Sequence, residues 1–234
     1  MGTPDRPERP GGTAPHVLVP DVERPALDAA DRHHLERVRR LRAGDPVSVT
    51  DGRGSWRWCR LGADLEPDGP VAHDPAPEPR LTLAFALVKG GRPELVVQKL
   101  TELGVDRIVP FLAERSVVRW DGDRAVRNAE RLRRVAHEAV GQSRRTWAPE
   151  VGDPVTFADV AALPDSAGAE LGGEPPSLRR PTLLVGPEGG WSSAERAALQ
   201  ATVGLARTVL RAETACIAGA AVLGALRSGV VGAR

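Results

Sequence analysis

The sequence predicts an α/β protein, with a mainly parallel sheet preceded by a small β-rich module. From residue 81 onward, short apolar runs typical of buried strands alternate with helical stretches, an order that favours parallel sheets. Earlier in the chain, two alternating runs flank an Asp-Gly turn, which indicates a β-hairpin. Residues 62–80 lie between these regions and contain five prolines, which predicts a domain boundary. The 234 residues are enough for both parts to bury a core.

The N-terminal module is expected to span residues 16–78. The preceding residues 1–15 are rich in Pro, Gly and Arg and poor in apolar residues, so they predict a disordered tail. Residues 28–42 predict a short helix, because leucine and valine recur there at helical spacing. Residues 47–50 and 55–61 are expected to form the two strands of the hairpin.

The C-terminal domain, residues 79–234, carries the predicted α/β pattern. Strands are expected at residues 81–88, 105–112, 182–185 and 206–210. Helices are expected at residues 93–103, 124–140 and 214–228, and after Ser192, where a Ser-x-x-Glu capping box begins. The acidic, proline-rich residues 149–181 predict loop structure with room for one short element.

The last predicted helix, TACIAGAAVLGALRS, is apolar on every side. A helix without a polar face is expected to be buried all round. Burial in the core explains this pattern, and a dimer interface explains it equally well, because small residues allow close backbone approach.

Composition limits the classes of function. No apolar run reaches the ~18 residues of a membrane span, and the N-terminus lacks the apolar region of a secretory signal. Cys59 and Cys216 are the only cysteines, too few for a disulfide framework or a zinc site. The net charge of +1 argues against a uniformly basic nucleic-acid binder.

The near-neutral total conceals a separation of charge. Residues 31–42 hold five arginines against two acidic residues, residues 115–145 hold nine against four, and residues 149–176 hold six acidic residues and no basic one. One predicted helical face carries Arg124, Arg127, Arg131 and Arg134. Charge alone favours a solvated face, with pairs of Arg134 to Glu130 and Glu138. The alternative is a stripe that contacts phosphates, because guanidinium groups match phosphate oxygens.

Two loops near the C-terminus are candidates for a ligand pocket. Residues 186–190 (Gly-Pro-Glu-Gly-Gly) and 211–215 (Arg-Ala-Glu-Thr-Ala) each follow a predicted strand and precede a predicted helix. Ligands of open α/β sheets bind at the carboxyl ends of strands, and glycines let a backbone approach a ligand closely. Residues 186–190 match neither a phosphate-binding loop nor a GxGxxG fingerprint. A tight turn also explains this loop, and an N-cap role of Thr214 explains the second one.

Five motifs in order resemble one known family. They are HHLERVRRLRAGDPVSVTDG (33–52), ELVVQKLTELGV (94–105), EAVGQSRR with a later proline (138–149), LLVGPEGGWS (183–192) and LRAETA (210–215). Together they resemble the bacterial 16S ribosomal RNA uracil-N3 methyltransferases of the SPOUT superfamily. The first motif is similar to that family's PUA-like RNA-binding barrel. The resemblance covers residues 16–230, and the order of the motifs makes it specific.

The resemblance implies a C-terminal α/β domain with a trefoil knot that binds S-adenosylmethionine. It also implies a cytoplasmic homodimer that acts on 16S rRNA of the 30S subunit, without metal or membrane. The implied cofactor site comprises Val185, Gly186, Pro187, Glu188, Gly189, Gly190, Leu210, Arg211, Glu213 and Thr214. The implied RNA-binding residues are Arg37, Arg39, Arg40, Gln142, Ser143, Arg144 and Arg145. Two positions depart from the family pattern: Ala212 replaces a threonine, and Trp147 stands where a basic residue is common.

Methylation of uracil N3 requires the loss of its proton and an unpaired or flipped base. Glu213 is the first candidate for proton acceptor, and Arg211 and Arg145 are candidates for stabilising the uracil anion or binding its phosphate. Alternatives are a SPOUT methyltransferase acting on transfer RNA or 23S rRNA, and a non-catalytic RNA-binding ribosome-assembly protein. An enzyme of small molecules is less favoured, because the basic segments would then have no role.

Overall fold

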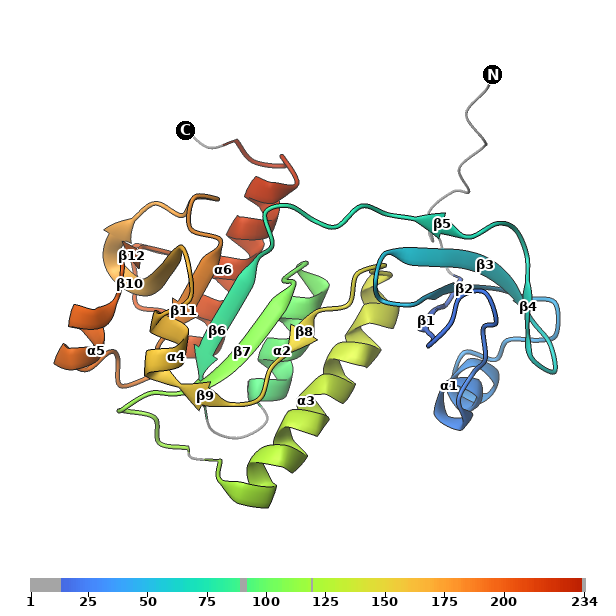
Figure 1. The fold of residues 1–234 in the computed structure, drawn as a ribbon, viewed down its shortest axis with the longest axis horizontal. Helices are drawn as coiled ribbons and strands as arrows, with labels where there is room; N and C mark the ends of the chain where they lie inside the picture. Colours follow the sequence, from blue (N-terminus) through green and yellow to red (C-terminus); the bar gives the residue numbers. More distant parts are fainter. Residues whose placement is uncertain (1–13, 89–91, 119, 233–234) are drawn as a thin grey trace. The chain divides into compact units, whose positions relative to one another are not determined.

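The computed structural model describes residues 14–88, 92–118 and 120–232 of the chain. The predicted disordered tail therefore lies, apart from its last two residues, outside the described part. The chain forms two compact units (Figure 1). The N-terminal unit extends to Ala76 and also includes His137–Ala148, whereas Pro77–Ala136 and the residues from Pro149 onward form the C-terminal unit. His137–Ala148 had been expected, from the sequence, within the C-terminal domain of residues 79–234.

The N-terminal unit contains a five-stranded sheet. Its strands are β1 (His16–Leu18), β2 (Pro46–Thr50), β3 (Ser55–Leu61), β4 (Leu65–Pro67) and β5 (Ala72–His73). β2 and β3 pair antiparallel, with Thr50 opposite Trp56, so the predicted hairpin is confirmed. β1 pairs parallel with β2, and β4 and β5 pair with β3.

The helix of this unit is shorter than the sequence predicted. α1 (Ala29–His33) begins at Asp28, whose side chain accepts a hydrogen bond from the Asp31 amide. It continues as the π-helical turn η1 (His34–Val38), so helical backbone ends at Val38 rather than residue 42. Leu35 is buried in the core of this unit, while Val38 is exposed, because the wider turn changes the helical period.

The C-terminal unit is built on a seven-stranded parallel sheet, as the alternating pattern predicted. Its strand order is β12-β10-β11-β6-β7-β8, and β9 also pairs with β7. The strands are β6 (Thr82–Ala86), β7 (Arg107–Leu112), β8 (Glu150–Val151), β9 (Val155–Thr156), β10 (Ser166–Glu174), β11 (Thr182–Val185) and β12 (Thr202–Val203). The helices are α2 (Arg92–Glu102), α4 (Phe157–Ala161), α5 (Ser193–Ala198) and α6 (Ala212–Arg227). The helix α3 (Gly122–Ser143) belongs to this unit up to Ala136, and its last turns belong to the N-terminal unit.

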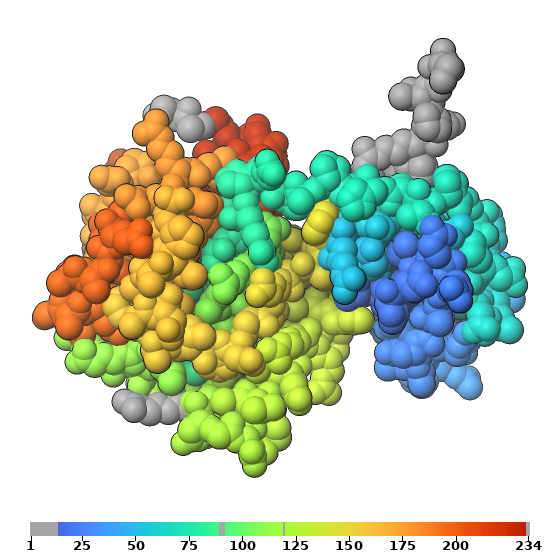
Figure 2. Space-filling model, viewed as in Figure 1, coloured from blue at the N-terminus to red at the C-terminus, as the bar shows by residue number. Residues whose placement is uncertain are grey.

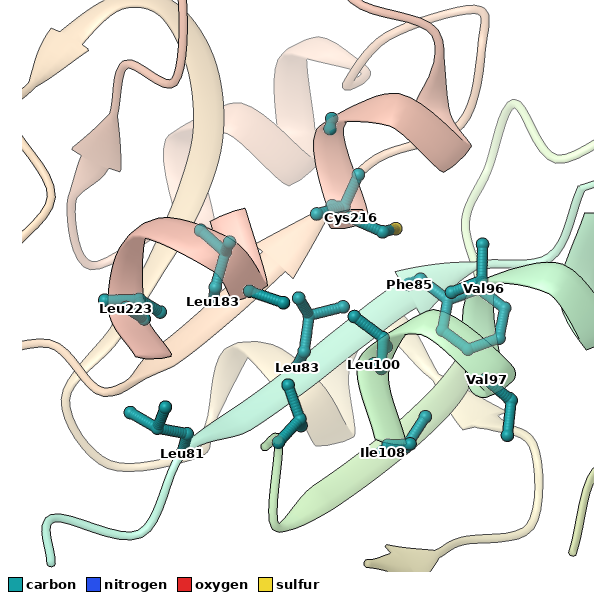
Figure 3. Packing of buried hydrophobic residues seen from close by; sticks show 14 of the residues in the cluster. Leu81, Leu83, Phe85, Val96, Val97, Leu100, Ile108, Leu183, Cys216 and Leu223 are labelled. Carbon is teal, nitrogen blue, oxygen red and sulfur yellow. The ribbon is translucent and has the colours of Figure 1, made fainter. Parts of the chain in front are cut away.

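Both faces of this sheet are covered, which explains the continuous apolar composition of β6. Leu83 and Phe85 point into a cluster with residues of α2 and α6 (Figure 3). Ala84 and Ala86 point into a second cluster on the other face, which includes Val160 of α4. The alternation of side chains along one strand thus joins helices on both sides into a single unit.

Two sequence predictions in this unit are wrong. Residues 149–181 are not mainly loop, because they contain β8, β9, α4 and β10. Residues 206–210 are not a strand, and β12 precedes them instead. β10 (SAGAELGGE) escaped prediction because its close neighbours require small residues rather than an apolar alternation. A Cβ at Gly168 would lie 2.5 Å from Leu199, and one at Gly173 would lie 2.7 Å from the Val203 backbone.

The last helix, α6, is buried along one face and not all round, which corrects the prediction. The buried residues are Ala212, Ala215, Cys216, Gly219, Ala220 and Leu223. Other apolar residues, including Ile217 and Val222, are half-buried. Gly219 permits close packing on the sheet, because a Cβ there would overlap the Leu183 side chain.

An ion pair fixes the C-terminal end of α6 to the sheet. The Arg227 guanidinium donates to the Asp106 carboxylate, which also accepts a 2.9 Å hydrogen bond from the Leu81 amide. Arg227 donates further to the carbonyl of Gly104 at 2.6 Å. Both charged side chains are largely buried. This contact joins the end of α6 to the residues that precede β6 and β7.

Two arginines of α3 form ion pairs, and one of them, Arg131, is on the predicted arginine-rich face. Figure 2 shows the first turns of α3 at the surface of the C-terminal unit. Arg131 pairs with Glu94 of α2 at 3.0 Å, and Arg133 pairs with Asp153 at 2.7 Å. Among the described residues, Arg134 forms no ion pair with its helical neighbours Glu130 or Glu138, so the two predicted pairs are absent, although Arg134 is exposed as on a solvated face.

Candidate cofactor-binding site

A pocket of about 260 Å³ lies in the C-terminal unit. Three segments supply most of its lining: residues 169–171 of β10, residues 185–188 and 190–191 at the end of β11 and in the loop after it, and residues 205–206, 208–210 and 212 leading into α6. The walls are mainly apolar, and Glu170, Glu188 and Arg196 supply charged groups. The two loops selected from the sequence therefore meet at one pocket, joined by a β10 segment that the sequence analysis had treated as loop.

The predicted cofactor residues divide into two groups. Those that line the pocket are Val185, Gly186, Pro187, Glu188, Gly190 and Leu210. Four others, Gly189, Arg211, Glu213 and Thr214, lie beside it without lining it. Arg211 occupies the N-cap position of α6 and is exposed, and Thr214 is also exposed. Ala212, the departure from the family pattern, is buried against the pocket.

Trp191 holds the glycine-rich loop in place. Its ring stacks on Phe111 with a centroid distance of 6.1 Å and an interplanar angle of 6°. Its indole N–H donates to the Ala169 carbonyl at 3.1 Å, which ties the loop to β10. A Cβ at Gly186 would lie 3.0 Å from the indole, so only glycine fits without displacing the ring.

The chain after Trp191 confirms the predicted capping box. The Ser192 hydroxyl accepts from the Glu195 amide, and the Glu195 carboxylate accepts from the Ser192 amide at 2.9 Å. Glu195 is buried, and its other oxygen accepts a 2.8 Å hydrogen bond from the Glu114 amide after β7. The start of α5 is thus joined to the neighbouring strand-end loop.

Arg92, at the start of α2, connects the two predicted loops. Its Nη1 lies 3.2 Å from Glu188 Oε1, and its Nε lies 3.6 Å from Glu213 Oε1. Only 14% of the Glu213 side chain is exposed, and its Oε2 has no hydrogen-bond partner in the described part of the chain. A single cation therefore faces one carboxylate of the pocket wall and a second, more buried one from α6.

Neither Arg92 nor Glu170 was predicted from the sequence as a residue of the site. Arg92 lies just before the predicted helix, and a lone arginine at a helix start carries no signal for a pocket. Glu170 is in residues 149–181, which were expected to be mainly loop. Its Oε1 accepts from Arg196 Nη1 at 2.8 Å, while its Oε2 has no hydrogen-bond partner among the residues described.

Cys216 lies one turn beyond Glu213 and is fully buried. Burial raises the pKa of this thiol well above its usual range, and the nearby Glu213 carboxylate acts in the same direction. A protonated, inaccessible thiol is neither a nucleophile nor a metal ligand. In the described chain, no group of three or more His, Cys, Asp or Glu residues has a metal-binding arrangement.

The predicted RNA-binding residues all lie in the N-terminal unit. Arg37, Arg39, Arg40 and Gln142 are exposed, and Ser143, Arg144 and Arg145 are half-buried. Arg40 and Arg144 have positive φ angles of 57° and 55°, where the chain leaves η1 and α3. The Ser143 hydroxyl donates back to the Ala139 carbonyl at 2.6 Å, so it has a partner within the helix.

A parallel α/β unit with this pocket and a separate small β-sheet unit define the class of the protein. The family model described as the RNA methyltransferase domain matches residues 75–224, and the model described as the RNA methyltransferase PUA domain matches residues 27–64. The protein is thus an RNA methyltransferase with a PUA-like domain and a SPOUT-type fold, as its motifs predicted.

Curated relatives narrow this class. The ribosomal RNA small subunit methyltransferase E of Synechocystis is 33% identical, over 86% of this chain and 72% of the relative. The protein of the same name from Bacillus subtilis is 30% identical, over 81% of this chain and 85% of the relative. The chain belongs to the family of ribosomal RNA small subunit methyltransferase E.

Solved structures agree with this family. The ribosomal RNA small subunit methyltransferase E of Neisseria gonorrhoeae, bound to S-adenosyl methionine, is 26% identical and has a TM-score of 0.76. That alignment covers 91% of this chain and 98% of the other. A methyltransferase from Legionella pneumophila, 24% identical with a TM-score of 0.79 over 92% and 98% of the two chains, shares the fold.

Proposed function

We propose that this protein transfers the methyl group of S-adenosylmethionine to N3 of a uridine in 16S rRNA. The observation that carries the proposal is the pocket between the Gly-Pro-Glu-Gly-Gly loop and the start of α6, in a chain of this methyltransferase family. The Neisseria gonorrhoeae relative, which aligns over most of this chain, was crystallised with the same methyl donor.

The pocket residues fit this cofactor. Val185, Leu205 and Leu210 offer apolar surface for an adenine ring, and the glycines leave backbone groups accessible. The Glu170 carboxylate, which has one oxygen without a partner among the described residues, suits the hydroxyl and cationic groups of the ligand. The bound cofactor supplies an activated methyl group, and the protein supplies position and proton transfer.

In the proposed mechanism Glu213 accepts the N3 proton of the uracil. Its buried Oε2 lacks a hydrogen-bond partner in the described chain, and Arg92 faces its other oxygen. Arg211, exposed at the N-cap of α6, and Arg145 are proposed to stabilise the uracil anion or to bind its phosphate. Arg37, Arg39, Arg40, Gln142, Ser143 and Arg144 are proposed to contact the RNA.

We also propose that the 30S subunit is a partner of this protein, that the protein is a homodimer, and that it is cytoplasmic. The half-buried apolar residues of α6 offer a surface for a second copy of the chain. No helix in the described part of the chain is long and apolar enough to cross a membrane. The trefoil knot also remains a prediction from the family resemblance.

Radiolabelled methyl transfer to 30S subunits and to naked 16S rRNA, followed by nucleoside mass spectrometry, tests the function. We expect 3-methyluridine, with one methyl group per 16S rRNA. Incorporation into neither substrate would overturn the proposal. Label that appears only in 23S or transfer RNA would favour the alternative substrates, and RNA binding without binding of S-adenosylmethionine would favour the non-catalytic alternative. RNA affinity should fall as salt concentration rises, because phosphate contacts release counterions.

Replacement of Arg92 by alanine is expected to weaken S-adenosylmethionine binding about fivefold to tenfold. The change leaves Glu188 and Glu213 without their shared cation, so the pocket wall near Glu188 loses support. Calorimetric titration with the cofactor measures the effect. Lys99→Ala is the matched control, because Lys99 is the other basic residue of α2 and pairs with Glu102 instead. Equal affinities of the Arg92→Ala and wild-type proteins would contradict the role assigned to Arg92.

A further inference from the structure

The chain beyond α3 is bonded to the sheet of the N-terminal unit. The carbonyl of Thr146 accepts hydrogen bonds from the Gly54 amide at 2.8 Å and from the Thr50 hydroxyl at 3.1 Å. The Thr146 hydroxyl donates to the buried carboxylate of Asp74 at 2.8 Å. The Ala148 amide donates to the Gly52 carbonyl at 2.9 Å. Residues 146–148 therefore have a fixed path along the β2–β3 hairpin.

Trp147 belongs to the same contact. Its indole N–H donates to the Asp74 carbonyl at 3.0 Å, and its ring meets that of His73 edge-on at 6.1 Å. A Cβ at Gly54 would lie 2.8 Å from the indole. The tryptophan that replaces a common basic residue of the family thus packs on the N-terminal sheet.

His16 extends these contacts to the backbone of Arg145. The imidazole is 5% exposed; its Nε2 lies 3.0 Å from the Arg145 carbonyl oxygen, and its Nδ1 lies 2.8 Å from the Ser48 hydroxyl. A carbonyl only accepts, so Nε2 carries the proton. Nδ1 of the neutral ring then accepts from the Ser48 hydroxyl, which also lies 3.2 Å from the Pro15 carbonyl oxygen. Burial lowers the pKa of His16 to about 4, so the ring is neutral at physiological pH.

Backbone contacts at the end of α3 also fix the conformation of residues 144–145. The Arg145 amide donates to the Val140 carbonyl at 3.2 Å, and Arg144 adopts the left-handed conformation that ends the helix. A Cβ at Gly141 would lie 2.8 Å from the His16 carbonyl oxygen, so the last turn of α3 lies against β1. The Arg145 peptide is thus held by the helix through its amide and by His16 through its carbonyl.

We propose that His16 is a positioning residue for RNA binding. By holding the Arg145 carbonyl, it sets the directions in which the Arg144 and Arg145 side chains leave the backbone. Arginines on an ordered backbone lose less conformational entropy when they bind phosphate or a base than arginines on a mobile loop. The inference rests on the proposed function for the identity of the ligand, an RNA. In this proposal His16 does not contact the RNA itself. It controls the RNA affinity of Arg144 and Arg145, which do.

His16→Ala is expected to raise the Kd and the KM for 16S rRNA about tenfold, and to leave the Kd for S-adenosylmethionine unchanged. One lost hydrogen bond accounts for about fivefold to tenfold, and the loosened segment adds to it. His16→Gln, whose amide N–H can still donate to the Arg145 carbonyl, should recover at least half of the lost affinity on a logarithmic scale. Filter binding gives the RNA Kd, and calorimetry gives the cofactor Kd.

Leu61→Val is the matched control for stability. Leu61 is buried in the core of the same unit, and its aliphatic side chain has no group that could hydrogen-bond to residues 142–148. It should lower the melting temperature without changing RNA affinity. Two outcomes would overturn the inference: an RNA Kd of His16→Ala within twofold of wild type, or an equal loss of affinity in Leu61→Val. The inference and the proposed function can fail separately. If His16→Ala binds RNA more weakly than wild type, but the wild-type protein transfers no methyl group to 16S rRNA, the inference is supported and the proposed function is overturned.

Discussion

Replacement of Glu213 by glutamine is expected to lower kcat for methyl transfer at least 100-fold, with the affinity for S-adenosylmethionine unchanged within about twofold. A positioned general base contributes roughly 10²–10⁴ in rate, and glutamine keeps the shape of the side chain without accepting the N3 proton. Cofactor affinity should persist because Glu213 does not line the pocket. Single-turnover methylation at saturating cofactor gives the rate, and calorimetry gives the affinity.

Two comparisons separate proton transfer from a structural role of Glu213. Glu188→Gln changes the other carboxylate that faces Arg92, and we expect it to affect cofactor affinity more than kcat. Arg92→Ala removes the cation between them. If Glu213 only held Arg92 in place, Glu213→Gln and Arg92→Ala would show the same modest loss of cofactor affinity. Near-normal turnover of Glu213→Gln with intact cofactor binding would exclude Glu213 as the proton acceptor.

Replacement of Arg227 by alanine is expected to destabilise the C-terminal unit by about 3–5 kcal/mol, because the largely buried Asp106 charge loses its partner. The loss also removes donors to the carbonyls of Gly104 and Pro79. Urea unfolding followed by tryptophan fluorescence measures the change in the free energy of unfolding. Trp191 reports on this unit, since its ring packs on Phe111 of β7.

The double variant Arg227→Ala with Asp106→Asn tests the cause of that loss. Asparagine removes the buried charge and keeps an oxygen that accepts from the Leu81 amide. We expect the double variant to be more stable than Arg227→Ala alone, since the uncompensated charge is the larger penalty. If the two variants have the same stability, the lost packing of Arg227, and not the uncompensated buried charge of Asp106, explains its effect.

Much of the fold was accessible from local signals in the sequence. The β2–β3 hairpin was predicted from alternation and an Asp-Gly turn, and the start of α5 from its capping box. These predictions succeed because turn and cap preferences depend on residues within a few positions of one another. β6 and β11 were predicted from short apolar runs, because strands covered on both faces are apolar throughout.

The failures have a common physical cause. β10 consists mostly of glycine, alanine and glutamate, and its place between β12 and β11 depends on the close approach of Leu199 and Val203. Residues 206–210 have strand-like composition, but all of them except Arg207 line the pocket. Neighbouring residues in the sequence indicate neither the strand at β10 nor the lack of a strand at residues 206–210, because the contacts that decide both come from distant segments.

The sequence by itself determined the family, the strand-and-helix order of most of the C-terminal unit, and the two loops that meet at the pocket. Tertiary structure decided which of the loop residues line that pocket, that Arg92 faces both Glu188 and Glu213, and that His137–Ala148 belongs to the N-terminal unit. Motifs reflect local backbone and chemical requirements, so the residues that form them are close together in the sequence and can be recognised there. Burial and charge pairing join residues tens of positions apart, such as His16 and Arg145, and only the folded chain brings them together.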